Sequence, residues 1–161
     1  MTWTDFVVNA RAITTYYDVV PELSGVRLRS VHLEGWGCAV TLRLDLPRFF
    51  DRSDDMPGDT AQCHIQFLMV QDFRMEGWRR AVTADVTLHE QPEHRLAVQV
   101  RGSGVAVSFT SNASLKVGRI SSFRRTADGG DGGQHHFSRP LERKRYPMIP
   151  PTYSSTFYER V

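Results

Sequence analysis

The sequence predicts an α+β protein that is mostly β, in which one N-terminal helix packs on a mainly antiparallel sheet or sandwich of about seven strands. Apolar and polar residues alternate over most of the middle of the chain, which indicates half-buried strands. Short turns join these segments, and short links favour antiparallel neighbours. The chain of 161 residues also contains no apolar run of the ~20 residues that a membrane span requires.

The N-terminal helix is predicted from apolar residues at helical spacing. The stripe consists of Phe6, Ala10, Ile13 and Tyr17. Thr4 or Asp5 is suited to cap the helix, and Pro21 ends it because proline cannot continue a helix. We expect this stripe to lie against the sheet.

A hairpin is predicted next, because the apolar period changes to two at Val26. The apolar phase shifts near Ser30, which indicates a β-bulge in the first strand. Residues 35–37 form the turn, and residues 40–46 form a half-buried strand whose polar positions include Arg43 and Asp45.

The remaining strands follow the same pattern. Residues 63–73 are more continuously apolar, which predicts one central strand buried on both faces. Alternation predicts further strands over residues 82–88, 96–100, 105–109 and 115–123.

The composition changes after Arg125, so we expect one domain over residues 1–124 and a basic, Gly- and Pro-rich C-terminal extension over residues 125–161. Aromatic residues in the extension favour partial docking on the domain, with a mobile loop at residues 129–133.

Residues 34–46 resemble residues 76–88, with seven of thirteen positions identical. Two interpretations stay open. Both segments use the same turn-and-strand pattern, or the chain contains a duplicated hairpin with pseudo-symmetry.

Charge and cysteine content indicate a cytoplasmic protein without a cofactor. The net charge is +2, without the local excess that is typical of nucleic-acid binders. Two cysteines and the absence of a signal-peptide pattern at Met1 favour reduced thiols. No histidine or cysteine pair has the spacing of a metal motif, so no metal site, cofactor or catalytic residue is predicted.

The candidate binding residues are aromatic and acidic. Trp36 and Trp78 each follow Glu-Gly at a strand edge, and such a position is typical of interface hot spots or of a ring that covers the end of a core. Phe49 and Phe50 are adjacent, so in an extended segment one of them is expected to be exposed. The loop after the second strand carries the carboxylates Asp51, Asp54, Asp55 and Asp59.

The order of these features resembles the immunity protein 50 family of bacterial polymorphic-toxin systems. The segments that carry the resemblance are residues 16–23, 26–33, 40–47, 65–67, 77–78 and 104–109. The resemblance covers about residues 3–123. It implies a cytoplasmic protein that binds a cognate toxin domain and blocks it by steric occlusion, without catalysis. A membrane or nucleic-acid partner is not expected, and an exposed strand edge makes a homodimer plausible.

Two other functions stay open. A small-molecule or lipid carrier requires a large apolar pocket lined by strands, and an exposed Trp36 argues against it. An enzyme requires a histidine or carboxylate with a strongly perturbed pKa in a cleft, and the histidines to inspect are His32, His64 and His89.

Overall fold

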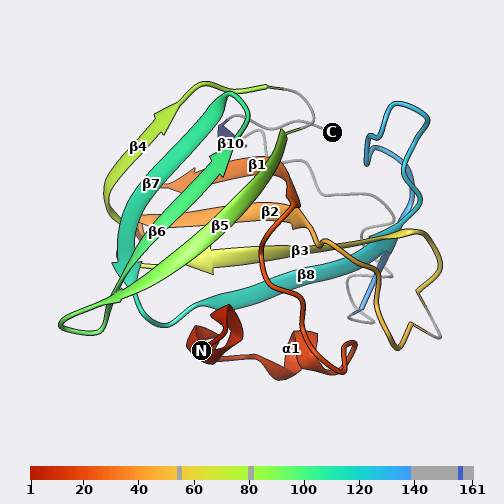
Figure 1. Ribbon diagram of the computed structural model, residues 1–161, viewed down its shortest axis with the longest axis horizontal. Coiled ribbons are helices and arrows are strands. Elements are labelled where there is room, and N and C mark those ends of the chain that lie inside the picture. Colours follow the sequence, from red (N-terminus) through yellow and green to blue (C-terminus); the bar gives the residue numbers. More distant parts are fainter. Residues whose placement is uncertain (54–55, 80–81, 139–155, 158–161) are drawn as a thin grey trace.

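Alternating apolar residues build one open antiparallel sheet, which the computed structural model describes over residues 1–53, 56–79, 82–138 and 156–157 (Figure 1). The strands are β1 (Val26–Glu34), β2 (Ala39–Asp45), β3 (Thr60–Phe67), β4 (Gln71–Glu76), β5 (Val82–Gln91), β6 (Arg95–Gly102), β7 (Val105–Asn112), β8 (Lys116–Phe123), β9 (His135–Phe137) and β10 (Thr156–Phe157). Their order is β4-β7-β6-β5-β1-β2-β3-β8-β9, and β10 pairs with β1 outside this path. The prediction of a mostly β, antiparallel protein is confirmed, but the strands outnumber the seven expected.

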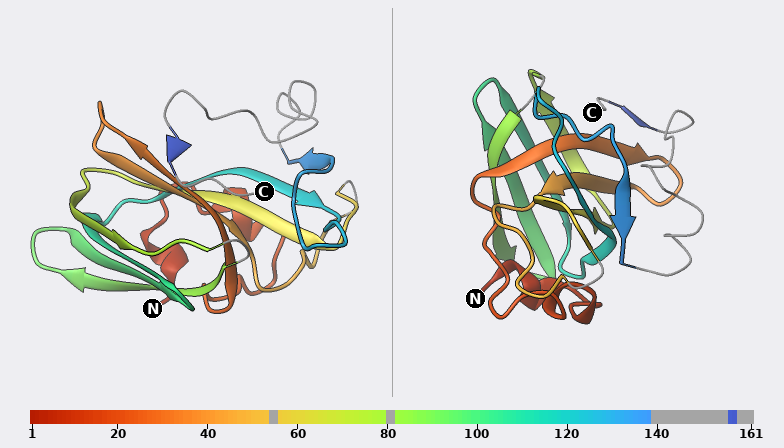
Figure 2. Two further views of the ribbon diagram at one scale, coloured as in Figure 1. Left: turned by 90° about the horizontal axis from the view of Figure 1, so that it is seen from above. Right: turned by 90° about the vertical axis from the view of Figure 1, so that its right-hand side faces the viewer.

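The sheet curls so strongly that its two halves face each other (Figure 2). The Phe67 ring on β3 meets the Phe109 ring on β7 at a centroid distance of 5.1 Å, although four strands separate β3 from β7 in the sheet. Both rings are at most 3% exposed. The core therefore fills the space inside the curl.

The β1–β2 hairpin forms as predicted, including its bulge. Leu28 pairs with Leu44 and Ser30 pairs with Arg43, so Arg29 is the extra residue of β1. A bulge changes the direction in which the following side chains point and increases the local twist. It also brings Arg29 into a buried position, with 3% of its surface exposed.

The predicted single strand over residues 63–73 is wrong, because the chain turns after Phe67. Met69 has a left-handed φ of 53°, and its side chain is 61% exposed. The first part, β3, lies between β2 and β8, whereas β4 lies at the far edge of the sheet beside β7. A continuous run of apolar residues does not reveal this turn, because a residue such as Met carries no turn signal.

The predicted N-terminal helix is also wrong as one element. The chain forms a 3-10 turn, η1 (Trp3–Phe6), and a single helical turn, α1 (Arg11–Thr14). Between them Val7 is extended and bridges Leu115, and the amide of Val8 donates to the Leu115 carbonyl at 2.9 Å. This pairing with the segment before β8 interrupts the helix. Within the described ranges no helix has the length and apolar character of a membrane span.

The two similar segments do not form a duplicated hairpin. The first, residues 34–46, joins neighbouring strands β1 and β2. The second, residues 76–88, joins β4 to β5, and these strands pair instead with β7 and with β1 and β6. The structure therefore favours a shared turn-and-strand pattern.

Candidate functional site

Trp36 is the most exposed large apolar side chain in the described part of the chain, at 100% exposure. It lies in the turn between β1 and β2, where Gly35 and Gly37 flank it. The pairing between the two strands runs from Glu34, which pairs with Ala39, down to Arg27, with one register shift at the Arg29 bulge. A rigid hairpin thus presents a large aromatic ring that does not pack against the protein's own core.

A second turn lies against this one. The amide of Val70 donates to the Cys38 carbonyl at 2.7 Å, which fixes residues 68–70 beside residues 35–38. Met69 is 61% exposed there, and its carbonyl accepts a hydrogen bond from Arg95 at 2.9 Å. We call residues 35–38 and 68–70 together the Trp36 surface.

Both turns of the Trp36 surface contain strained backbone. Cys38 has a φ of 46° and Met69 a φ of 53°, in the left-handed region that non-glycine residues rarely adopt. Such a residue costs about 1–2 kcal/mol and persists where the surrounding structure holds it. The hydrogen bonds to neighbouring strands supply that support.

Trp78 does not share this surface. It is half-buried and packs against the core. It follows Gly77, whose φ is 73° and where a Cβ would lie 2.1 Å from the Gly104 carbonyl oxygen. Strand β4 begins just after the Trp36 surface and ends at Glu76, and its six residues span about 20 Å. The structure therefore does not bring the two tryptophans together.

Phe50 belongs to the core rather than to a surface, since it is 6% exposed. Its ring lies 5.0 Å from that of Tyr16, 5.4 Å from that of Tyr17 and 5.4 Å from that of Phe49. Phe49 is half-buried in the same cluster. The expectation that one of the two phenylalanines is exposed is wrong, because the chain bends at Pro47 instead of continuing extended.

Asp51 and Asp59 are exposed but already bound within the chain. Asp51 accepts hydrogen bonds from Arg48 at 2.6 Å and from the Asp18 amide at 2.8 Å, and these bonds lower the pKa of its carboxyl. Asp59 accepts from the Arg125 amide at 3.0 Å and from Thr60, which likewise lower its pKa.

The loop that carries these aspartates is not a separate acidic surface in its described part. Arg52 pairs with Asp18, and Arg124 lies 3.9 Å from Asp59. Asp54 and Asp55 lie outside the described residues. The loop also lies at the end of β2 opposite to Trp36, so these candidates do not form one site with it.

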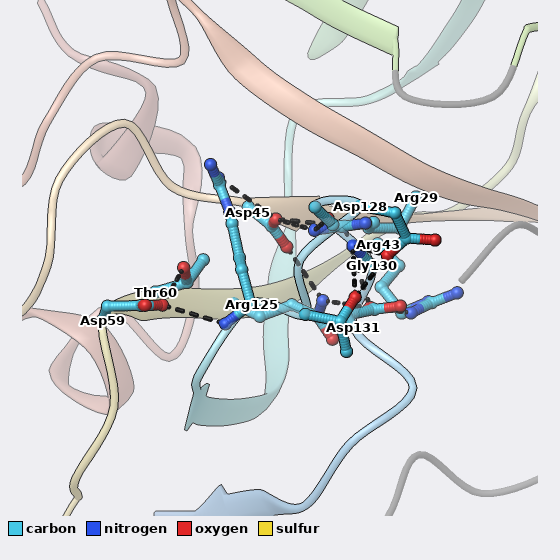
Figure 3. Close-up of polar contacts among 12 residues, drawn as sticks. Arg29, Arg43, Asp45, Asp59, Thr60, Arg125, Asp128, Gly130 and Asp131 are labelled. Atoms are coloured by element: carbon cyan, nitrogen blue, oxygen red, sulfur yellow. Dashed lines mark hydrogen bonds and ion pairs between the residues drawn. The ribbon is translucent and has the colours of Figure 1, made fainter.

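A buried network of charges is the site that the sequence does not reveal (Figure 3). Arg29 binds Asp45 through Nε at 3.0 Å and through Nη2 at 2.5 Å, and Arg43 pairs with Asp131. Gln62 joins the two pairs, because its amide nitrogen donates to Asp45 at 2.9 Å and to Asp131 at 2.7 Å. These side chains are nearly inaccessible to water.

The segment after β8 completes the network by supplying Asp131 and the carbonyl of Gly129. Asp131 is 0% exposed and comes from the Gly-rich stretch that was predicted to be a mobile loop. The carbonyl of Gly129 accepts from Arg29 at 2.9 Å, and Arg125 approaches Asp45 at 3.4 Å. The prediction that Arg43 and Asp45 lie on a solvated strand face is wrong, because this segment and β9 cover that face.

His135 connects the same segment to β8 through a ring contact and hydrogen bonds. Its ring stacks on Phe123 at 4.6 Å, one nitrogen contacts the Ser121 hydroxyl at 3.1 Å, and the other contacts the Asp131 carbonyl at 2.7 Å. Burial lowers the pKa of His135 despite the hydrogen bond to Asp131, which raises it. The neutral imidazole therefore acts as a packed, hydrogen-bonded core residue.

Among the histidines, His64 has the most perturbed environment. It pairs with Arg43 across β2 and β3. Burial, followed by the charges of Arg43 and Arg119, lowers the pKa of His64 from 6.5 to about 3. His64 is thus neutral at physiological pH. In the described ranges no group of three or more His, Cys, Asp or Glu side chains is placed to hold a metal ion.

Two surface hollows lie beside the N-terminal segment. One, of about 310 Å³, is lined by Trp3, Phe6, Val86 and His89 among others. The other, of about 220 Å³, lies between α1 and β8 and includes Arg11 and Arg119 in its lining. Neither occupies the centre of the curled sheet, where Phe67 and Phe109 meet.

Comparison with known proteins gives one family match. The family model described as Immunity protein 50 matches residues 9–122, which cover β1 to β7 and most of β8. Comparison with the curated proteins and with the solved structures gives no significant match. Asp131, which completes the buried network, lies beyond the matched range.

Proposed function

Because the chain belongs to the immunity protein 50 family, we propose that it binds a cognate toxin domain and neutralises it by steric occlusion, without catalysis, in the cytoplasm. The observation that carries the proposal is the complete exposure of Trp36 on a rigid hairpin. Complete burial of a tryptophan against a partner removes roughly 150–250 Å² from water, which corresponds to about 4–6 kcal/mol of transfer free energy. Since the hairpin is already ordered, little of this is lost to ordering.

The Trp36 surface supplies the centre of the proposed interface. Met69 extends its apolar area, and Cys38 lies exposed between Trp36 and the β2 strand. The exposed charged residues Glu34 and Asp72 lie in sequence directly before its first segment and shortly after its second. An apolar centre with a polar rim is the usual composition of a protein interface. Phe50 is not part of the proposal, because it is buried in the core.

The acidic loop contributes little to partner choice in this proposal. Arg48, Arg52 and Arg124 lie beside the described aspartates and offset their charge. Long-range attraction of a strongly basic toxin would require an unpaired acidic face. We therefore propose a partner that is recognised through apolar contact first, with charge in a secondary role.

The two alternatives are less well supported. A carrier needs its ligand cavity inside the curl, and the rings of Phe67 and Phe109 already fill that position. The exposure of Trp36 also argues against a carrier. For an enzyme, His64 has the required pKa perturbation, but its position beside Arg43 explains that perturbation by burial and charge.

The test is co-expression of the tagged chain with the toxin domain encoded beside it. We expect a stoichiometric complex and rescue of growth, and Trp36→Ala should strongly weaken both while Trp36→Phe keeps more of the affinity. Val19→Ala is the matched control, because Val19 is 73% exposed but lies in another loop. Rescue by Trp36→Ala at wild-type level would overturn the assigned surface, and failure of the unaltered chain to bind would overturn the function.

A further inference from the structure

Strand β1 has one side that its neighbours only partly occupy. On the β2 side the pairing runs from Arg27 to Glu34. On the opposite side β5 pairs only with residues 26–28. This pairing reaches Leu28, which lies opposite Val82, the first residue of β5, and the two residues before Val82 lie outside the described residues. Within the described part of the chain, β5 does not pair with residues 30–34, and backbone groups on this side of the strand need a partner.

The chain's own C-terminal region fills part of this edge. In β10, Phe157 pairs with Val31 and Thr156 pairs with His32, in antiparallel orientation. This pairing uses backbone groups, which any extended segment offers. The edge thus accepts a strand that comes from far away in the sequence, and the strand is only two residues long.

The edge leads directly to the Trp36 surface. Strand β1 ends at Glu34, two residues before Trp36. Because β10 runs antiparallel to β1, a strand in this position enters beside the turn and proceeds toward the bulge. An occupant longer than β10 would therefore contact the Trp36 surface with its N-terminal part and β1 with its C-terminal part.

We propose that this edge of β1, over residues 30–34, is a strand-accepting groove that binds an extended segment of the toxin in place of β10. The inference rests on the proposed function, and it specifies the partner's contribution as a β-strand. Main-chain hydrogen bonds supply affinity in such strand addition, and alternate side chains supply specificity. The residues Thr156 and Phe157 act as an internal occupant that a partner strand replaces. Apparent affinity is then reduced by the fraction of molecules in which the groove is filled.

The first experiment needs no toxin. In the full chain, Thr156→Pro with Phe157→Pro removes two backbone donors from β10, whereas Thr156→Ala with Phe157→Ala keeps them and serves as the matched control. We expect those amides of residues 30–33 that point away from β2 to exchange hydrogen at least roughly tenfold faster in the proline variant only, while the amides that point toward β2 stay protected. A synthetic peptide of residues 152–161, added to the proline variant, should restore protection, and a scrambled peptide should not. Equal exchange in both variants, or no effect of the peptide, would overturn the groove.

The second experiment uses the toxin domain. The proline variant should bind it several-fold more tightly, on the order of three- to tenfold, because no internal strand competes. The complex should protect those amides of residues 30–33 that point away from β2. Toxin binding that leaves these amides and the affinity of the proline variant unchanged would overturn the groove while the proposed function stands. Absence of any toxin complex, with peptide binding intact, would overturn the function alone. Dimerisation of the proline variant in light scattering, with the same amides protected, would assign the edge to a second copy and overturn the toxin strand.

Discussion

The Trp36 surface and the buried Arg–Asp network both depart from the general rule that large apolar side chains are buried and charged side chains are exposed. Trp36 is completely exposed, whereas Arg43 and Asp131 are at most 1% exposed. The two regions differ in whether the chain itself supplies the contacts of these side chains. The charges are paired within the chain by Gln62 and by each other, with only Oδ1 of Asp131 lacking a hydrogen bond in this described network, and the indole leaves its apolar area uncovered. Removal of one buried group should therefore affect folding, and removal of the exposed ring should affect only what binds.

The largest expected effect is on the buried side. Asp131→Ala leaves Arg43 buried without its carboxylate, and breaking a buried pair in this way costs about 3–5 kcal/mol of unfolding free energy. Urea denaturation measures the loss. Arg124→Ala is the control, since its side chain is 77% exposed and should change stability by less than about 0.5 kcal/mol. The double variant Arg43→Met with Asp131→Leu should recover part of the loss, and equal stability of Asp131→Ala and the unaltered chain would contradict the comparison.

Trp36→Ala should show the opposite behaviour. Its unfolding free energy should stay within about 0.5 kcal/mol of the unaltered chain, because the ring contributes no buried area. Toxin affinity should fall by about 2–4 kcal/mol, the range of an interface hot spot. Calorimetric titration and urea denaturation of the same sample separate the two effects. A large loss of stability would mean that the ring has a structural role.

Acid should lower the stability of the folded chain through His64, which pairs with Arg43 across β2 and β3. The pKa of His64 is about 3 in the folded chain and 6.5 ordinarily, so between these values the unfolded chain binds the extra proton. Stability should therefore fall as the pH drops below about 6.5, by about 2 kcal/mol at pH 5. His64→Gln should flatten this dependence, measured as the urea midpoint at pH 7 and pH 5. The exposed His94, changed to Gln, should leave it unchanged.

Labelling of the two cysteines compares an exposed and a buried region without any substitution in the chain. Cys38 is exposed on the Trp36 surface, whereas Cys63 is buried and its thiol pKa is raised to about 12 by burial. A thiol reagent should label one cysteine in the folded chain and both in denaturant. Bound toxin should slow labelling of Cys38. Unchanged labelling in the complex would place the interface elsewhere.

Local patterns in the sequence account for most of the sheet. The phase shift near Ser30 predicts the bulge that the register confirms, and alternation locates β5, β6 and β7. These features depend on neighbours within a few residues, which a sequence displays directly. The family resemblance is also confirmed by the match over residues 9–122.

Features that depend on distant residues are not visible in this way. Arg43 reads as a solvated strand position, and its partner Asp131 is 88 residues away. Ile13, which belongs to the predicted apolar stripe, is buried as expected. The pairing of Val7 with Leu115 interrupts the predicted helix before it reaches Ile13. The sequence predicts the exposure of Trp36 only in part. Its position in a turn favours an exposed ring, but the same residues are equally compatible with a ring that covers the end of the core.

The late position of Asp131 in the chain also bears on how the protein is made. The arginines of β1 and β2 leave the ribosome long before their carboxylate partner, and His135 follows later still. A nascent chain that ends before this segment holds Arg43 without its partner, so the native arrangement cannot be completed during the synthesis of the matched family region. The buried network therefore forms only after Asp131 has been synthesised, and premature termination after β8 should yield chains that cellular proteases remove.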